Sequence, residues 1–297
     1  MITVFAPDGV GEVVAGTDLA AAVVDAVAAD PLGPLQAGDV VVVTSKVVSK
    51  ADGLVRVATD REQAITEQTA ATVARRGATR IVRTHAGLTV AAAGVDNSNV
   101  APGTVLVLPA DPDARAADLH AALTRATGLP LGVVVSDTAG RAWRMGQTDH
   151  AIGAAGLRVV ERYAGRRDGY GNDLQVTAMA VADEVAGAAD LAKGKLEGRP
   201  VAVLRGLAHL VEPPGQPDGR AADLIRPPEQ DMFGHGAREA VLAAVLAATG
   251  QAGRYEELVA LEGEERTAAV LAGAAAQGTG LDPAAAALLR AVLTAAG

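Results

Sequence analysis

The sequence of 297 residues contains no cysteine. This absence excludes disulfides, thiolate zinc sites, iron–sulfur clusters and a cysteine nucleophile. Aromatic residues make up only 2% of the chain, so an extended platform of aromatic rings for a single-stranded nucleic acid is not expected. The chain has 26 basic and 35 acidic residues, and its formal charge of −9 argues against a broad nucleic-acid or anionic-membrane surface.

Long apolar runs are also missing. No run reaches the roughly 18 residues that a membrane-spanning helix needs, and the first residues do not combine a basic segment with a long apolar one. We therefore expect a cytoplasmic protein without a secretory signal. The balance of 49% hydrophobic and 21% charged residues is that of a soluble globular protein.

The common nucleotide and hydrolase signatures are absent as well. There is no glycine-rich phosphate loop of the G-x-x-x-x-G-K-[ST] type, no dinucleotide fingerprint between a strand and a helix, and no nucleophile elbow. The histidines are scattered without zinc-type spacing, at positions 85, 120, 150, 209 and 235. Only His150 remains a candidate metal ligand, because it follows a polar stretch at 137–149.

Hydrophobic patterning predicts an α+β fold with mixed sheets and flanking helices. The β-branched runs 40–44 and 131–136 are typical of fully buried strands. Strands and helices do not alternate regularly enough for a uniform βαβ array. Further strands are predicted at 2–5, 80–84, 87–93, 104–108 and 200–204, and helices at 17–29, 60–76, 114–127, 179–193, 236–248, 254–272 and 283–296. We expect one main domain over 1–245, possibly of two subdomains, and an alanine-rich helical extension over 246–297.

Two carboxylates stand out by their position in this pattern. Asp96 lies in a turn after a β segment, and Asp137 directly follows a buried strand and precedes the hydroxyl of Thr138. Carboxylate and hydroxyl oxygens are ligands for a hard cation such as Mg²⁺ or Mn²⁺. The alternative is that both aspartates only cap turns.

Several charged residues have similarly open interpretations. Lys46 and Lys50 follow a buried strand and could neutralise phosphates as compact point charges, or be surface lysines. Arg141 and Arg144 flank the only tryptophan and could bind carboxylate or phosphate, or stack on its ring. The acidic pair at 183–184 lies on a predicted helix, where such pairs are usually solvated.

Taken together, five segments resemble the coenzyme F420:L-glutamate ligase (gamma-glutamyl ligase) family. They are 43–53, 93–100, 136–149, 167–172 and 181–191. The resemblance runs from the N-terminus to about residue 245. It is closest to the actinobacterial version, in which this domain is commonly fused to a flavin-binding, nitroreductase-like domain.

The resemblance implies a GTP-dependent ligase that joins L-glutamate to the deazaflavin precursor coenzyme F420-0 and can extend the chain through γ-carboxyl linkages. It implies an acyl-phosphate intermediate, Mg²⁺ or Mn²⁺, a helpful K⁺ ion and a homodimer with an α+β fold of its own. Phosphoryl transfer is mostly positioning and charge neutralisation, so a chain without cysteine or an evident triad can perform it.

The resemblance also implies roles for individual residues. The GTP contacts fall on Val10, Gly11, Glu12, Val13, Ser45, Lys46, Lys50, Asn99 and the stretch 193–200, and the metal ligands on Asp96, Asp137 and Thr138. Many relatives have a metal-binding glutamine where this chain has Lys195. A cation cannot ligate a metal, so we expect Lys195 to contact a phosphate. Arg141 and Arg144 are candidates for binding anionic substrate groups, and Asp183 or Glu184 for orienting the incoming amine.

Two other functions stay open at this stage. One is a non-catalytic nucleotide or deazaflavin carrier, and the other is a metal-dependent phosphohydrolase that uses Asp96 and Asp137. The stretch beyond residue 245 is too short for a flavin nitroreductase domain, so we expect no bound flavin and no reductase activity. It is expected instead to cap the ligase domain or to contribute to a dimer.

Overall fold

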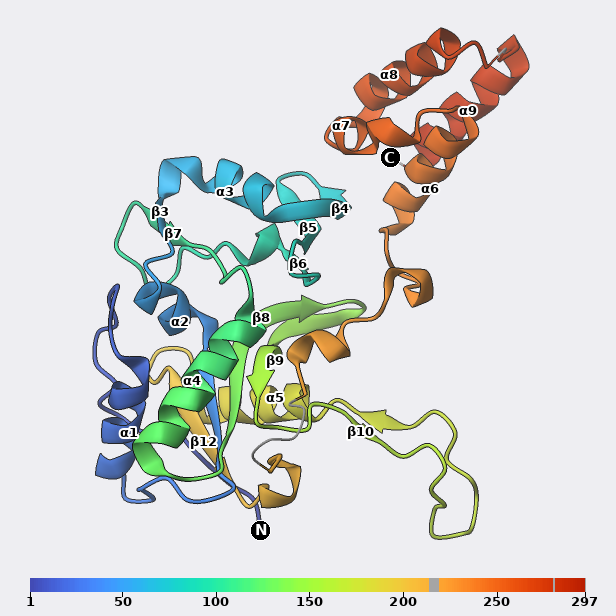
Figure 1. Cartoon of the computed structure of the whole chain (residues 1–297). Coiled ribbons are helices and arrows are strands. Elements are labelled where there is room, and N and C mark those ends of the chain that lie inside the picture. Colours follow the sequence, from blue (N-terminus) through green and yellow to red (C-terminus); the bar gives the residue numbers. More distant parts are fainter. Residues whose placement is uncertain (214–218, 280, 297) are drawn as a thin grey trace. The chain divides into compact units, whose positions relative to one another are not determined.

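The two valine-rich runs form the centre of a five-stranded sheet in the computed structural model, which describes residues 1–213, 219–279 and 281–296. The strand order is β1-β12-β2-β8-β9 (Figure 1). Only β2 and β8 pair in parallel, and the other neighbours are antiparallel, which confirms the predicted mixed sheet. The strands are β1 (Thr3–Phe5), β2 (Val40–Thr44), β8 (Gly132–Arg141), β9 (Arg144–Ala155) and β12 (Val201–Arg205).

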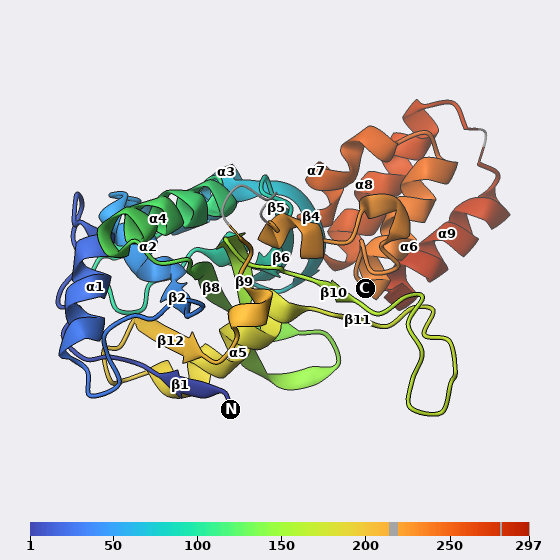
Figure 2. The same cartoon turned by 60° about the horizontal axis from the view of Figure 1, so that its bottom comes forward.

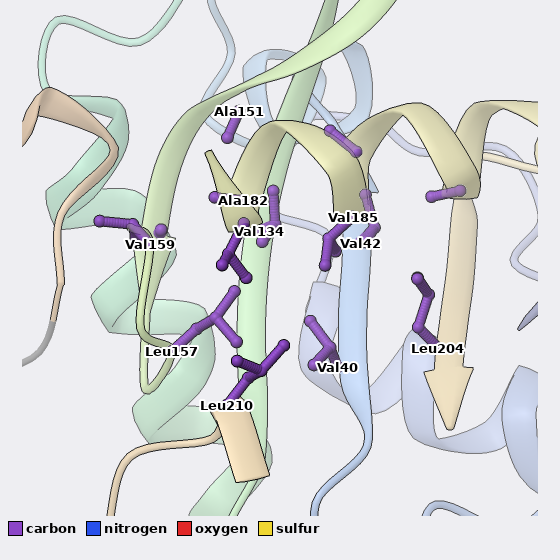
Figure 3. Packing of buried hydrophobic residues seen from close by; sticks show 14 of the residues in the cluster. Val40, Val42, Val134, Ala151, Leu157, Val159, Ala182, Val185, Leu204 and Leu210 are labelled. Atoms are coloured by element: carbon purple, nitrogen blue, oxygen red, sulfur yellow. The ribbon is translucent and has the colours of Figure 1, made fainter. Parts of the chain in front are cut away.

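Helices cover both faces of this sheet, which is why the central strands are valine-rich on both faces. On one face, α5 (Val181–Lys193) packs Ala182 and Val185 against Val42 and Val134 of the sheet, as Figure 3 shows. On the other face, α4 (Pro112–Thr127) packs against β8 and β9, and α1 (Leu19–Ala29) packs against α4 (Figure 2). The predicted helices near these positions are confirmed within two residues at each end.

The β8–β9 hairpin is longer than the sequence predicts. The predicted strand ends at residue 136, whereas β8 continues to Arg141 and returns as β9 from Arg144. Asp137 pairs with His150, and Thr138 pairs with Asp149. Because successive side chains of a strand point to opposite faces, Asp137 and Thr138 project on opposite sides of the hairpin.

Shorter elements complete this unit. Helix α2 (Ser45–Ala51) follows β2 directly, and β3 (Val55–Val57) pairs with β7 (Thr104–Leu106). The sequence predicts that the glycine-punctuated segment 151–178 is rich in strand. In the structure this segment contains the end of β9 and the short strand β10 (Glu161–Arg162), which pairs with β11 (Ala178–Met179). Short 3₁₀ helices lie here at Ala58–Asp60, Ala208–Leu210 and Ala221–Leu224, and others lie outside this unit or at its boundary, at Ala92–Gly94, Pro228–Gln230 and Ala252–Arg254. The segment 211–230, rich in proline and glycine, is predicted to be a long loop, and part of it lies outside the described residues.

The chain divides into two compact units, of which the first comprises Met1–Ala64 and Gly94–Arg226. The second comprises Ile65–Ala93 and Pro227–Gly297. This division differs from the expected boundary after residue 245, which falls inside α6 (Ala237–Ala248). The reason is that residues 65–93 fold with the C-terminal helices and not with the strands that flank them in sequence.

The second unit contains a three-stranded antiparallel sheet. Its strands are β4 (Thr69–Arg76), β5 (Thr79–Thr84) and β6 (Thr89–Ala91). The helix predicted over 60–76 is therefore wrong in its second half, because α3 (Arg61–Gln68) ends where β4 begins. Pairing of β4 with β5 outweighs the local helical preference of this polar segment.

Four helices complete the second unit: α6, α7 (Tyr255–Val259), α8 (Gly263–Ala276) and α9 (Pro283–Ala296). They enclose an apolar core of Leu242, Val245, Leu246, Leu258, Val259, Val270 and Leu293. The predicted helix 254–272 is split into α7 and α8. No helix within the described ranges combines the length and the apolar character that crossing a bilayer requires.

Candidate active site

The candidate site lies at the edge of the sheet where β2 ends beside β8, which continues past this edge to Arg141. The two strands are parallel, and Thr44 of β2 pairs with Ser136 of β8, so the residues that follow them leave the same edge of the sheet. Ser45, which follows Thr44 and begins α2, and Asp137, which follows Ser136 in β8, both contribute to the site. The buried hydroxyl of Ser45 donates a 2.7 Å hydrogen bond to Oδ1 of Asp137. A buried strand end therefore fixes the carboxylate that the sequence singles out.

A first group of side chains, called here the carboxylate cluster, gathers around Asp96 and Asp137. The Lys46 ammonium lies 2.7 Å from Oδ2 of Asp96. The backbone N–H and the hydroxyl of Ser98 donate to the same carboxylate at 2.8 and 3.1 Å, and Lys46 also donates to the Ser98 hydroxyl. Asp96 thus caps its turn, as one alternative predicts, and at the same time faces the end of α2.

The two carboxylates differ in the direction of their pKa shifts. Burial raises the pKa of Asp137, and the charges of Asp149 and Asp96 raise it further, against the lowering effects of Ser45 and His150. Burial also acts to raise the pKa of Asp96, but hydrogen bonds and charge from Lys46 and Ser98 outweigh it and lower the pKa. The charge of Asp96 thus acts on Asp137, and it is the last of the effects that raise the pKa of Asp137.

This cluster fits a hard divalent cation. Carboxylate oxygens are the ligands that Mg²⁺ and Mn²⁺ prefer, and a cation would relieve the cost of burying Asp137 beside other negative charges. In the part of the chain that the structure describes, no three His, Asp or Glu side chains form a metal-holding group. The protein would supply few ligands, and water or phosphate oxygens would complete the coordination shell.

A second group, called here the lysine cluster, lies on the opposite side of β8. It consists of Ser136, Thr138, Asp149, Asp190, Lys193 and Lys195. The buried Asp149 is its centre. Its Oδ2 accepts from the Ser136 hydroxyl at 2.9 Å and from Lys193 at 2.8 Å, and its Oδ1 accepts from the Thr138 hydroxyl at 2.5 Å. Thr138 therefore contributes its hydroxyl to this second cluster.

Lys195 closes the lysine cluster on its solvent side. Its ammonium lies 2.7 Å from Oδ1 of Asp190, 3.1 Å from Oγ1 of Thr138 and 3.5 Å from Oδ1 of Asp149. Burial acts to lower the pKa of Lys195, but Asp190 and Asp149 outweigh it and raise the pKa. Burial acts to raise the pKa of Asp149, but Lys193 and the hydroxyls lower it. The cluster therefore holds charged ammonium and carboxylate groups.

The distribution of lysine is a signal that the sequence reading missed. Of the 26 lysine and arginine residues, only four are lysines, at 46, 50, 193 and 195. Lys46, Lys193 and Lys195 belong to the two clusters, and Lys50 lies on α2, where it pairs with Glu12 at 3.1 Å. A chain that uses arginine at every other basic position thus places three of its four compact ammonium groups in these two clusters and the fourth on α2. This scarcity could have directed attention to Asp149 and Ser136, which were not predicted.

The N-terminal loop lies beside α2. Besides the Glu12–Lys50 pair, the backbone N–H of Gly16 donates to the carbonyl of Ala51 at 2.8 Å. Val10 and Val13 are buried and anchor the loop, while Gly11 adopts a positive φ of 74°. The predicted nucleotide contacts at 10–13, 45, 46 and 50 thus come from adjoining segments. Asn99, with a φ of 55°, follows the Asp96 turn by three residues.

Other predicted residues lie outside both clusters. Arg141 and Arg144 are exposed at the tip of the β8–β9 hairpin, where Arg141 donates to the carbonyl of Met145 at 3.3 Å. At roughly 3.3 Å per residue, the backbone at Arg141 lies about 13 Å beyond Asp137. Asp183 accepts a 2.9 Å hydrogen bond from the backbone N–H of Ala151 and so supports β9, and Glu184 is exposed on α5.

Comparison with known proteins shows which family the sequence matches. The model of the family described as F420-0:Gamma-glutamyl ligase matches residues 9–76 and 56–206, a range that includes both clusters. A protein of Methanopyrus kandleri named coenzyme F420:L-glutamate ligase is 37% identical over 219 residues, which cover 67% of this chain and 86% of the relative. A protein of the same name from Methanothermobacter thermautotrophicus is 35% identical over 254 residues, 78% of this chain and 98% of the relative.

Proposed function

Since the chain belongs to the F420-0:gamma-glutamyl ligase family, we propose that it joins L-glutamate to coenzyme F420-0 and uses GTP as the co-substrate. One observation supports this most: aspartate and lysine pairs lie at the edge of the sheet where β2 ends beside β8, inside the range that matches the family. Such an edge is where open sheets commonly bind ligands.

The proposed reaction has two steps. A carboxylate is a poor electrophile, so one oxygen of the F420-0 carboxylate first attacks the γ-phosphorus of GTP, which gives an acyl phosphate and GDP. The amine of glutamate then attacks the acyl carbon, a C–N bond forms, and inorganic phosphate leaves as the amine loses its proton. Both steps move negative charge between phosphate oxygens, and neutralising that charge is the main task of the protein.

Residues of the carboxylate cluster fit the charge-neutralising role. Asp96 and Asp137 would hold Mg²⁺ or Mn²⁺, which when bound neutralises phosphate charge and orients the reacting groups. Ser45 fixes the orientation of the Asp137 carboxylate through its 2.7 Å hydrogen bond. Lys46 and Lys50 project from α2 and would neutralise phosphate oxygens, with Lys46 leaving Asp96 when a metal binds. A K⁺ ion is proposed on the family resemblance alone.

Further residues complete the proposal. The loop 10–13 and Asn99 would contact GTP, since they adjoin α2 and the Asp96 turn. Arg141 and Arg144 would bind anionic groups of F420-0 or glutamate, because the hairpin tip presents both side chains to solvent. Glu184 is the candidate for orienting the amine, since Asp183 already accepts from the backbone of β9. A homodimer is proposed from the resemblance.

The test is an incubation of the full chain with GTP, Mn²⁺, L-glutamate and F420-0, followed by mass spectrometry. We expect F420-0 to gain one glutamate residue, GDP to form in equal amount, and Asp137→Asn to abolish both products. GDP without the glutamate adduct would instead indicate a phosphohydrolase. Binding of GTP or F420-0 without either product would indicate a non-catalytic carrier.

A further inference from the structure

The lysine cluster contains the oxygen ligands of a second cation site. Thr138 of β8, Asp149 of β9 and Asp190 of α5 present one hydroxyl and two carboxylates, which is the ligand chemistry of a hard divalent ion. These oxygens converge on one point. In the structure that point is occupied by the Lys195 ammonium, at 2.7 to 3.5 Å from all three residues.

The charges of the cluster are already balanced without an added ion. Two aspartates, Asp149 and Asp190, face two lysines. Lys193 binds the buried side of Asp149 and the Ser136 hydroxyl, at 2.8 and 2.9 Å. Lys195 binds the remaining oxygens. A divalent ion placed beside the Lys195 ammonium would meet like-charge repulsion at contact distance, so the two cations would not share this place.

We infer that Lys195 is the resident cation of this cluster: its ammonium holds the position between Thr138, Asp149 and Asp190 that a divalent ion would otherwise take. The chain therefore binds one divalent ion, at Asp96 and Asp137. Without Lys195, the oxygens of Thr138, Asp149 and Asp190 would bind a second one. The inference rests on the proposed function only for the metal of the carboxylate cluster. It departs from what the family resemblance implies for relatives with a glutamine at this position.

The properties of Lys195 suit a fixed cation. An ammonium is compact and presents its donors in any direction, so it can replace a spherical ion where the planar guanidinium of arginine cannot. Its side chain is 59% exposed, so the ammonium contacts the aspartates on one side and leaves the other side open to an anionic substrate oxygen. The positive charge at this place would then be independent of the free metal concentration.

The test measures Mn²⁺ binding to the full chain by electron paramagnetic resonance of the free ion, with isothermal titration calorimetry as a second method. Lys195→Gln should bind one Mn²⁺ ion more per chain than the wild type, because the substitution frees Thr138, Asp149 and Asp190 and adds a neutral oxygen ligand. Because Lys195 is exposed, the substitution should leave the protein folded, and circular dichroism checks this. Equal binding by the two proteins would overturn the inference.

Two further variants locate the added ion. Arg158→Gln removes the same charge and frees Glu212, its partner at 3.3 Å, outside both clusters, so it should add no ion. The double variant with Lys195→Gln and Asp190→Asn should lose the extra ion, and retention would place that ion elsewhere and overturn the assignment. The difference between variant and wild type does not depend on catalysis. If no glutamate adduct forms, or the wild type binds no Mn²⁺, the proposed function fails while this difference still decides the role of Lys195.

Discussion

The ammonium of Lys193 lies 2.8 Å from Oδ2 of Asp149, and the two side chains are only 4% and 3% exposed. This pair joins the end of α5 to the middle of β9. It holds Asp149 in place, and Asp149 in turn accepts from the Thr138 hydroxyl at 2.5 Å and lies beside Lys195. The lysine cluster thus depends on this one buried ion pair among its members.

Breaking this pair from one side should destabilise the protein strongly. Lys193→Met leaves a buried, uncompensated carboxylate, and we expect the free energy of unfolding to fall by about 3–5 kcal/mol. Chemical denaturation measures this loss. Adding Asp149→Asn to Lys193→Met removes the orphaned charge, so the double variant should lose less than the sum of the two single losses. Additive losses would contradict the pairing.

The two carboxylates of the other cluster should respond in opposite ways to neutralisation. Burial raises the pKa of Asp137, so this group favours the folded state at low pH, and that contribution is lost as pH rises through its folded pKa. In metal-free protein near neutral pH, Asp137→Asn should therefore raise the melting temperature. Asparagine can still accept the hydrogen bond from Ser45.

The pKa shift of Asp96, and therefore its contribution to stability, has the opposite sign to that of Asp137. Although burial acts to raise it, its pKa is lowered by Lys46 and Ser98, so its contribution to stability is present above the unfolded pKa and lost as pH falls through the folded one. Asp96→Asn should lower the melting temperature near neutral pH and leave it little changed in acid. Calorimetry of both variants over a range of pH provides the measurement, and shifts of equal sign would disagree with the geometry.

The hairpin tip offers a test of substrate binding that is separate from stability. Arg144 is exposed, so Arg144→Ala should leave the free energy of unfolding within about 0.5 kcal/mol of the wild type. If the guanidinium binds an anionic group of a substrate, KM for that substrate should rise by about tenfold or more while kcat changes less. Steady-state kinetics with each substrate varied in turn would show this, and unchanged kinetics would remove Arg144 from the proposed site.

In the second unit, a buried carboxylate of helix α6 accepts a hydrogen bond from the backbone of strand β4. The buried Glu239 of α6 accepts a 2.9 Å hydrogen bond from the backbone N–H of Arg75 in β4. Glu239→Ala would leave this N–H without an acceptor, and we expect a loss of about 1–3 kcal/mol and faster amide exchange at Arg75. Glu257→Ala, on the exposed face of α7, is the matched control and should change little. Equal effects of the two substitutions would contradict the role of Glu239.

The sequence predicts the parts of the fold that local patterns determine. The valine run 40–44 and helix 179–193 are recovered because periodicity and burial act over a few residues. The helix predicted over 60–76 fails because β4 forms only with a partner strand, and such pairing has no local signature. The same holds for the division of the chain, since residues 65–93 join helices that follow 140 or more positions later.

In the candidate site too, features set by local sequence are predicted, and features set by contacts between distant segments are not. Asp96 and Asp137 are predicted from a turn and from the end of a buried run, and in the structure the charge of Asp96 acts on the pKa of Asp137. Thr138 was grouped with Asp137 because the two are adjacent in sequence, whereas extension of β8 places their side chains on opposite faces. Asp149 and Ser136 were missed because their roles depend on hairpin register and on Lys193 from a distant helix.

The most direct test of the account follows the oxygen of the substrate carboxylate. F420-0 labelled with ¹⁸O in both carboxylate oxygens is incubated with the protein, GTP, Mn²⁺ and L-glutamate, and the phosphate is analysed by mass spectrometry. If the carboxylate attacks GTP and an acyl phosphate forms, each released phosphate carries one labelled oxygen and each new amide retains the other. Unlabelled phosphate would contradict phosphoryl transfer to the carboxylate, and with it the proposed reaction.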